Sequence, residues 1–136
     1  MGAQVTISEN ILVEDSLRAS PTGFEVQVLL NWYRSLPLSC VQTLELSVDG
    51  QAVPRSAIGF LINGRERSLD ELQDLVDEDW YVQDRATLRV KHAPPLKAGE
   101  RHDVALKLGS RIPYIVTGPS SALEQVSSLQ RQMVAL

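Results

Sequence analysis

Hydrophobic and polar residues alternate along several stretches of the chain, a pattern typical of β-strands with one buried and one solvent-facing side. The strongest run spans residues 24–32, in which the apolar side chains share one parity and Glu25, Gln27 and Asn31 the other. A second run spans residues 41–48. We therefore expect two half-buried strands, with Asn31 on the polar side of the first.

Further strands are predicted, with turn-forming residues between them. They lie at residues 51–53, 58–62, 80–83, 86–90, 103–108 and 112–117, with weaker signals at Val5, Ile7 and 11–13. Asp49-Gly50 and Asn63-Gly64 are typical of tight hairpin turns, because glycine tolerates positive φ and Asp or Asn can bond the local backbone. Pro113 indicates a sheet edge or a bulge, since proline cannot donate to a ladder.

Two segments show helical spacing instead. The first is predicted as a short helix from the apolar residues Leu69, Leu72, Leu75 and Val76, with Ser68 as its N-cap and Glu71 three residues later. The second is the C-terminal tail, whose apolar residues recur at intervals of three and four: Leu123, Val126, Leu129, Met133 and Leu136. This spacing predicts an amphipathic helix.

These elements together predict an all-β fold, an antiparallel β-sandwich with one short helix and a C-terminal amphipathic helix. The 136 residues are enough for one domain with its own core. We divide residues 1–136 into an N-terminal segment (1–22), the sandwich core (23–117) and a helical tail (118–136).

Composition and charge limit the classes of partner. The chain is 43% hydrophobic and 22% charged, as in ordinary globular proteins. A net charge of −4 argues against a nucleic-acid partner, and no apolar run is long enough for a membrane helix. The single Cys40 cannot form an internal disulfide, and the N-terminus lacks a secretion signal. We expect a cytoplasmic protein, although residues 2–6 match a loose myristoylation pattern.

The bend at residues 31–40, NWYRSLPLSC, interrupts the alternating pattern. It brings Trp32, Tyr33 and Arg34 together, and Pro37 then ends the strand. Such a corner between strands is well suited to recognition or to part of an active site. Arg34 could pair with a carboxylate, stack on an aromatic ring, donate to a ligand, or simply cover Trp32.

Other candidate groups have simpler interpretations. The carboxylates of Asp70, Asp74, Asp77, Glu78 and Asp79 could attract a cation, but a solvated face is the favoured interpretation. His92 and His102 have no nucleophile motif nearby, and Cys40 is expected to pack in the core. In RIPYI, residues 111–115, Arg111 and Tyr114 repeat the aromatic and arginine pairing at a strand start. We therefore predict no catalytic or metal-binding residue in this chain.

The order of these pieces resembles a known family. The strings FEVQVLLNW, WYRSLPLSCV, LELSVDGQ, Trp80 and RIPY are similar to the beta subunit of bacterial C-glycoside deglycosidase, over about residues 23–117. The string WYRSLPLSC, with VDG following Cys40, carries most of the resemblance. Residues 1–22 and 120–136 have no counterpart that we can place.

The resemblance implies a β-sandwich that works with a larger alpha subunit, a TIM-barrel protein that holds a divalent metal, typically manganese. Together they would cleave the carbon–carbon bond between a 3-oxo-glucosyl group and a flavonoid-type aglycone. A base would take the proton next to the ketone, the metal would stabilise the enolate, and the protonated aglycone would leave. This chain would then be the subunit of a lyase complex that binds no metal and is inactive alone.

From this resemblance we expect the substrate pocket or the subunit interface to include Trp32, Tyr33, Arg34, Ser35, Leu36 and Pro37, with Arg111 and Tyr114 as further candidates. Two alternatives remain open. One is a carbohydrate-binding sandwich without a catalytic partner, whose aromatic platform would be Trp32, Tyr33 and Trp80. The other is a purely structural assembly subunit.

Overall fold

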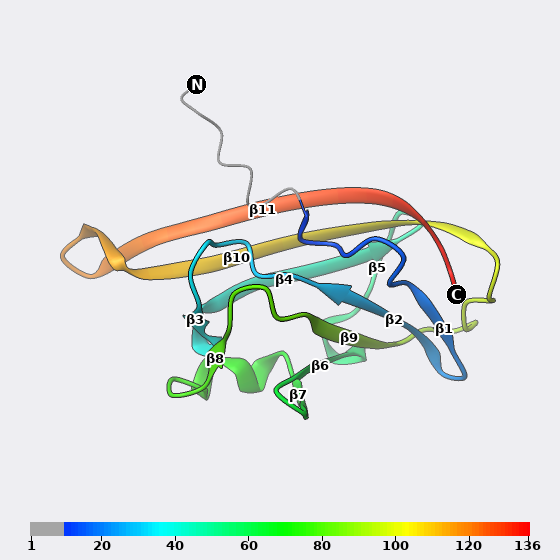
Figure 1. Ribbon diagram of the computed structural model, residues 1–136, viewed down its shortest axis with the longest axis horizontal. Helices are drawn as coiled ribbons and strands as arrows, with labels where there is room; N and C mark the ends of the chain where they lie inside the picture. The colour runs from blue at the N-terminus through cyan, green and yellow to red at the C-terminus, as the bar shows by residue number, and fades with distance from the viewer. Residues whose placement is uncertain (1–9) are drawn as a thin grey trace, which may run out of the picture.

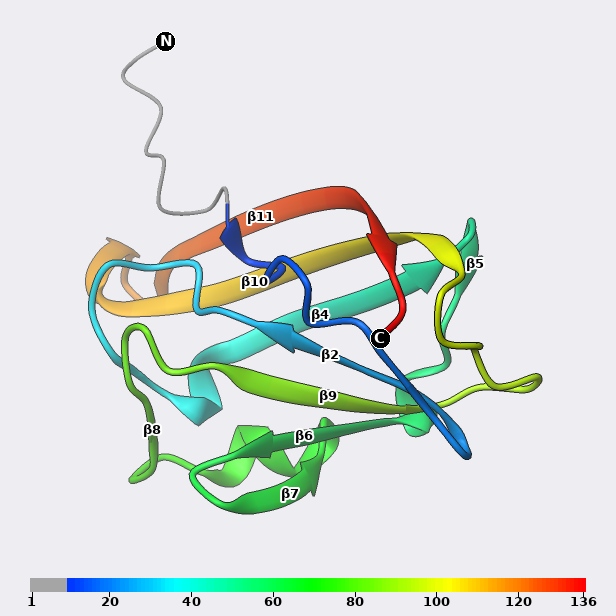
Figure 2. The ribbon, with the colours of Figure 1, turned by 45° about the vertical axis from the view of Figure 1, so that its right-hand side comes forward.

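The computed structural model describes residues 10–136 and shows two antiparallel sheets packed face to face (Figures 1 and 2). The five-stranded sheet has the order β1 (Arg18–Ser20), β2 (Gly23–Val28), β9 (Ala86–Lys91), β6 (Ile58–Ile62) and β7 (Arg65–Ser68). The four-stranded sheet has the order β11 (Ser121–Val134), β10 (Arg101–Gly118), β4 (Val41–Val48) and β5 (Gln51–Ala52). A third pair joins β3 (Leu36–Pro37) to β8 (Asp79–Trp80). The predicted antiparallel sandwich is confirmed.

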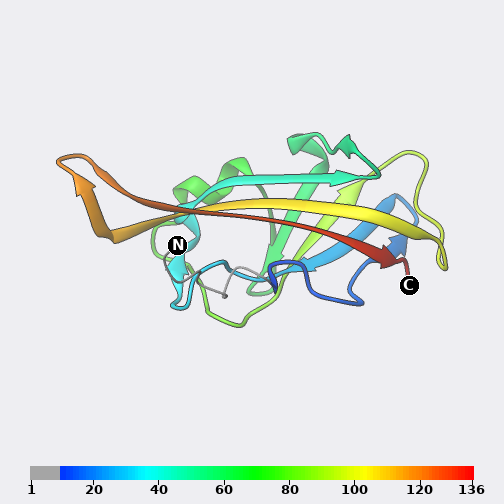
Figure 3. The same ribbon diagram turned by 90° about the horizontal axis from the view of Figure 1, so that it is seen from above.

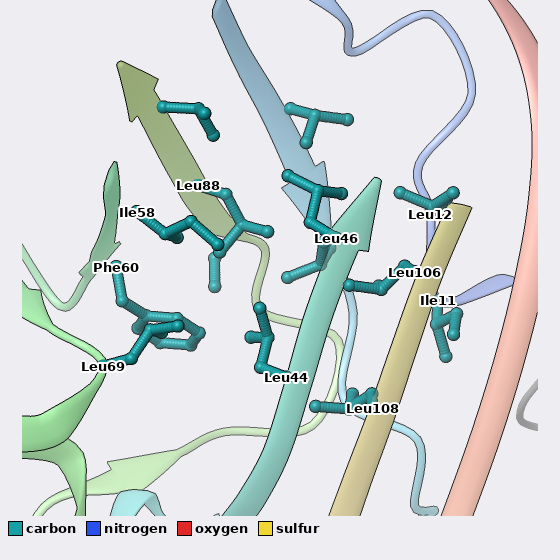
Figure 4. Packing of buried hydrophobic residues seen from close by; sticks show 14 of the residues in the cluster. Ile11, Leu12, Leu44, Leu46, Ile58, Phe60, Leu69, Leu88, Leu106 and Leu108 are labelled. Atoms are coloured by element: carbon teal, nitrogen blue, oxygen red, sulfur yellow. The ribbon is translucent and has the colours of Figure 1, made fainter. Parts of the chain in front are cut away.

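The core lies between the two sheets and follows the alternation of the sequence. Phe24, Val26 and Val28 of β2 are fully buried, while Glu25 and Gln27 between them are not. Leu44 and Leu46 of β4 and Leu106 and Leu108 of β10, on the opposite sheet, belong to the same buried cluster (Figure 4). Burial of one parity on each strand removes apolar side chains from water, and this is the main favourable contribution to the sandwich.

Both predicted hairpin turns are confirmed by the backbone angles. Asp49 and Gly50 have φ values of 52° and 81°, and Asn63 and Gly64 have 53° and 76°. Positive φ at both central positions is the type I′ arrangement, whose twist matches that of the flanking strands. These turns set the pairing of β4 with β5 and of β6 with β7.

The predicted C-terminal helix is wrong. Residues 121–134 form β11, which pairs with β10 in a long hairpin whose closed end projects beyond the other elements (Figures 1 and 3). The predicted strands at residues 103–108 and 112–117 are both parts of β10. The register between β10 and β11 shifts between Ile112 and Val116, which fits the irregularity expected at Pro113.

The tail looked helical because polar residues occupy part of its inward face. The inward residues of β11 include Leu123, Leu129 and Met133, but Ser127 and Arg131 lie between them. These two polar groups have specific partners elsewhere in the fold, so they interrupt the alternation that marks a strand. Together with the exposed Val126 and Leu136, the remaining inward apolar residues give a spacing of three and four, and local spacing cannot reveal the pairing with another strand.

The predicted short helix is only a 3-10 turn. It is η4 (Asp70–Asp74), one of three such turns together with η2 (Leu38–Cys40) and η3 (Arg55–Ala57) in the described chain. The expected Ser68 and Glu71 pair is present. The Ser68 backbone N–H donates to Glu71 Oε1 at 2.8 Å, and the Glu71 N–H donates to Ser68 Oγ at 3.3 Å. The capping pattern was therefore correct, but the helix it precedes is short.

Other predicted bounds also changed. β2 ends at Val28 rather than residue 32, and β8 covers only Asp79–Trp80. The predicted strand at Val5 and Ile7 and the myristoylation pattern at residues 2–6 lie outside the described residues. Within residues 10–136, the helical segments are too short to be membrane-spanning helices.

An ion pair holds the segment before β8 against β7. Arg67 reaches both oxygens of Glu78, with Nη2 at 2.7 Å from Oε1 and Nη1 donating to Oε2 at 2.8 Å. Asn63 donates to the same Oε2 at 3.1 Å. These hydrogen bonds, those from Arg67 first, lower the pKa of Glu78 to about 2. The backbone carbonyl of Glu78 in turn accepts from the Leu38 N–H at 2.8 Å.

Replacing Glu78 with Gln should reduce the pH dependence of stability. The native pKa of about 2 lies below the ordinary 4.5, so this stabilisation is complete above that ordinary value and is lost as the pH falls toward about 2. The difference in free energy of unfolding between wild type and Glu78→Gln should shrink through that window, as measured by urea denaturation at each pH. Arg67→Gln should behave alike, and a constant difference would contradict the assignment.

Candidate functional site

The bend begins with a buried polar residue, and here one prediction is wrong. Asn31, expected on the solvent side, is 0% exposed. Its Nδ2 donates to the Leu108 carbonyl at 3.0 Å, to the Gln125 carbonyl at 2.9 Å and to Ser127 Oγ at 3.2 Å. Its Oδ1 accepts from Ser110 Oγ at 2.7 Å. The strand ends at Val28, so the parity of the earlier residues does not extend to this side chain.

Asn31, Ser110 and Ser127 are the three buried polar residues of residues 10–136, and they form one hydrogen-bonded cluster. A buried amide costs free energy unless its donors and acceptor are satisfied. Here both ends of the amide have partners on β10 or β11. The cluster therefore fixes the start of the bend against the long hairpin, and a slip of either segment would leave polar groups unpaired.

The residues after Asn31 meet the hairpin on the surface. Trp32 Nε1 donates a hydrogen bond to the Tyr114 hydroxyl of β10. The Trp32 and Tyr33 rings lie 4.9 Å apart at 45°, and the Arg34 guanidinium carbon lies 5.1 Å from the centre of the Tyr114 ring. We call Trp32, Tyr33, Arg34 and Tyr114 the aromatic corner. The two sequence motifs singled out separately, WYRS and RIPY, thus meet at Tyr114.

Arg34 takes one of the four roles left open by the sequence, that of stacking on an aromatic ring. The ring is that of Tyr114, and the distance is within the range of a cation–π interaction. Both side chains are exposed, Tyr114 to 47%. The stacked arrangement orients the guanidinium while leaving it accessible to a carboxylate or another acceptor on a partner.

The next three residues of the bend connect it to β8 and to the loop that follows β8. Ser35 Oγ accepts from the Val82 N–H at 2.9 Å. Leu36, which is 2% exposed, pairs with Trp80, and Pro37 pairs with Asp79. Leu36 therefore belongs to the core and can act on a surface only through its neighbours.

Arg111 is not part of the aromatic corner. It lies opposite Glu124 in the β10–β11 ladder, half-buried. Its charge acts on Cys40, whose pKa is raised by burial and lowered to a lesser extent by Arg111. Cys40 is a buried free thiol, as expected from the sequence. Of the two residues predicted in RIPYI, only Tyr114 reaches the corner.

Sequence reasoning missed the exposed residues Tyr81, Val82 and Val116. The chain has three tyrosines, and Tyr33, Tyr81 and Tyr114 are exposed to 56%, 53% and 47%. They come from the bend, from the loop after β8 and from the hairpin, which lie at the same end of the molecule in two views (Figures 1 and 2). The only hint in the sequence was Tyr81, the aromatic residue directly after Trp80. A single residue forms no repeating pattern from which its exposure could be predicted.

The platform of Trp32, Tyr33 and Trp80 considered for a carbohydrate-binding protein does not form. Trp80 is 0% exposed, packs edge-on against Phe60 at 5.4 Å and donates from Nε1 to the Asp84 carbonyl at 2.9 Å. It therefore fills the core beneath the corner.

The other candidate groups are engaged elsewhere. His102 Nδ1 lies 2.7 Å from Asp49 Oδ2, and this hydrogen bond lowers the pKa of Asp49. His92 Nδ1 lies 2.9 Å from the Pro94 carbonyl oxygen. In the acidic cluster, Asp70 pairs with Arg55 at 2.7 Å. Residues 10–136 contain no group of three or more His, Cys, Asp or Glu side chains that could hold a metal ion.

Two surface hollows lie away from the corner. One, of about 470 Å³, lies over β6 and β9 and is lined in part by Glu25, Gly59, Glu66 and Arg89. The other, of about 440 Å³, lies over β4 and β10 and includes Ala105 and other small residues. The aromatic corner lines neither hollow, and its exposed rings are better suited to contact with another surface.

Comparison with known proteins connects this geometry to a family. Residues 4–114 match the family model described as C-glycoside deglycosidase beta subunit. A C-glycoside deglycosidase beta subunit of Microbacterium trichothecenolyticum is 34% identical over 117 residues, 86% of this chain and 88% of the relative. A 3'-dehydrocarminate deglycosidase beta subunit of Microbacterium sp is 40% identical over 107 residues, 79% of this chain and 80% of the relative.

A third relative extends the similarity into both terminal segments. This C-glycoside deglycosidase beta subunit of Arthrobacter globiformis is 32% identical over 128 residues, 93% of this chain and 97% of the relative. A match of that length includes parts of residues 1–22 and of residues 120–136. Parts of both segments, for which the resemblance alone placed no counterpart, therefore have counterparts in this relative.

Replacing Asn31 with Ala should lower the free energy of unfolding by about 1–3 kcal/mol, because Ser110 and Ser127 lose a buried partner. It should also weaken the packing of Trp32 against Tyr114, seen as increased quenching of tryptophan fluorescence by acrylamide. Gln132→Ala, at an exposed position of β11, is the control and should change neither measurement. Equal effects of the two variants would argue against the role given to Asn31.

Proposed function

The chain belongs to the C-glycoside deglycosidase beta subunit family, and on this basis we propose that it completes a carbon–carbon lyase by binding a catalytic alpha subunit. The proposed partner is a TIM-barrel protein that holds a divalent metal such as manganese. The proposed substrate is a C-glucoside of a flavonoid-type aglycone whose sugar carries a 3-keto group. The name of the Microbacterium relative, 3'-dehydrocarminate deglycosidase beta subunit, supports a substrate oxidised at the 3′ position.

In the proposed reaction, a base removes the proton from the carbon next to the ketone, and the electron pair of that C–H bond forms the enolate. The enolate then expels the aglycone, which is protonated as the carbon–carbon bond breaks. We assign the metal and the proton transfers to the alpha subunit. Cys40 is packed in the core, Asp70 and Glu78 are held in ion pairs, and His92 and His102 each bond through Nδ1, which supports this assignment.

The single observation that carries the proposal is the exposed aromatic corner. Tyrosine and arginine are enriched among the residues that dominate binding energy at protein interfaces. The corner presents Tyr33 and Tyr114 as rigid rings and Arg34 as a stacked cation, and its position is fixed by Asn31. We propose that this surface contacts the alpha subunit and closes one side of the aglycone pocket.

Three further exposed residues, Tyr81, Val82 and Val116, extend this proposed interface. Tyr81 and Val82 are joined to the bend through the hydrogen bond of Ser35, and Val116 lies two residues beyond Tyr114 at 71% exposure. Exposed apolar groups that gather at one end of a small protein mark an interaction site. These exposed side chains are also compatible with a second function, glycan binding by the isolated chain. Direct titration with oligosaccharides would detect it.

The single Cys40 supports a cytoplasmic location for the proposed complex, since it is a buried thiol without a disulfide partner in this chain.

Replacing Arg34 with Ala should lower turnover of a 3-keto C-glucoside by the reconstituted complex by about tenfold or more, because an interfacial cation stacked on an aromatic ring is lost. Titrating the alpha subunit separates two causes. Turnover restored at high alpha concentration indicates a role in subunit binding, whereas a loss at saturation indicates a role at the pocket.

Arg101→Ala is the matched control, because this exposed arginine lies at the opposite end of β10 from Tyr114. It should leave turnover unchanged, and both variants should keep the thermal stability of the wild type. Unchanged turnover and unchanged alpha binding in Arg34→Ala would contradict the proposed site.

A further inference from the structure

The long strand β11 forms an open edge of the four-stranded sheet. It has 14 residues, whereas the other strands at the edges of the two large sheets have three in β1, four in β7 and two in β5. Among residues 10–136, the backbone of residues 121–134 pairs with no strand except β10, and its one other hydrogen bond joins the Gln125 carbonyl to Asn31 Nδ2. An edge of this length presents a row of free N–H and C=O groups to another strand.

Of the usual devices that block such an edge, β11 has one inward-facing charge, Arg131, and a register irregularity at its start, but no exposed lysine and no proline. Proteins protect long edges with lysine, proline, bulges or a covering element. The exposed side chains of β11 are Ser121, Glu124, Val126, Ser128, Gln130, Gln132 and Val134. They include one charge, and the strand contains neither lysine nor proline. The edge is therefore suited to strand addition.

We propose that β11 pairs with β11 of a second copy of this chain, antiparallel about a two-fold axis at Val126. The two four-stranded sheets then form one continuous sheet. In this register, Ser121 of one copy lies opposite Arg131 of the other at each end of the paired segment. At the centre, Val126 lies opposite Val126 of the second copy. This inference uses residues outside the aromatic corner and does not depend on the proposed reaction.

The side chains of β11 favour this register over its neighbours. Leu123 lies opposite Leu129 on the face that packs against the core, and Val126 meets its own copy on the exposed face. Glu124 lies opposite Ser128, so the two carboxylates are offset. An axis at Glu124 would place like charges directly opposite, and an axis at Ser128 would place Leu129 opposite Ser127. Because the side chains of β11 are complementary to those of the same strand in a second copy, an identical chain is the partner that fits this edge.

The first experiment measures the mass of the full chain by sedimentation equilibrium over a range of concentrations. The wild type should approach twice 15.0 kDa and dissociate on dilution. Val126→Lys places two ammonium groups face to face at the axis and should raise the dissociation constant at least about tenfold. Val134→Lys is the matched control, because Val134 is exposed to 42% against 48% for Val126 but lies outside the paired residues.

The second experiment tests the register by disulfide formation. Opposite residues of an antiparallel pair have Cα atoms about 4.5–5.5 Å apart, which suits a disulfide. Val126→Cys should therefore form a covalent dimer under mild oxidation, while Val134→Cys should not. Cys40 is 1% exposed, and the wild type serves as its control.

Three results would overturn the proposal. The first is a monomeric wild type at every concentration tested, and the second is equal dissociation of the Val126→Lys and Val134→Lys variants. The third is protection of the β11 amides from hydrogen exchange only after an alpha subunit is added. That result would mean that the alpha subunit, and not a second copy of this chain, pairs with β11. Circular dichroism of each variant separates loss of pairing from loss of folding.

Discussion

The satisfied amide of Asn31 is the interaction on which the rest of the site depends. It joins the bend after β2 to the β10–β11 hairpin, whose contacting residues lie 77 to 94 positions further along the chain. Because a buried amide without partners is costly, only one placement of the bend against the hairpin satisfies all of its hydrogen bonds. Trp32 and Arg34 follow directly, and they can contact Tyr114 only when that placement is kept.

The core and the site are separated along the molecule. The sandwich buries its apolar residues between the two sheets, while the exposed tyrosines lie at one end, where the bend, the loop after β8 and the hairpin meet. Leu36, Trp80 and the Arg67–Glu78 pair connect the two regions, because they pack or bond beneath the bend. At the proposed interface, a rigid support of this kind would reduce the entropy lost when a partner binds.

The fold offers two different surfaces for assembly, and they use different physics. The aromatic corner presents side chains, so its partner must have a complementary shape and charge. The edge of β11 presents main-chain groups, so an identical strand can satisfy it if the side chains do not conflict. The chain belongs to a family of beta subunits, and a subunit of a complex needs at least one surface for contact with another chain. The two surfaces belong to different residues and can be disrupted independently.

The amino-acid sequence alone determined most of the sandwich, because alternation and turn chemistry are local. The strands β4, β6 and β9 and both type I′ turns follow from patterns of a few neighbouring residues. The family could also be recognised from the WYRSLPLSC string. The tertiary structure decided the burial of Asn31, the strand character of residues 121–134 and the meeting of Trp32 with Tyr114. Each of these depends on a partner roughly 80 to 100 residues away, or on pairing between whole strands, and no local pattern of polarity encodes such a contact.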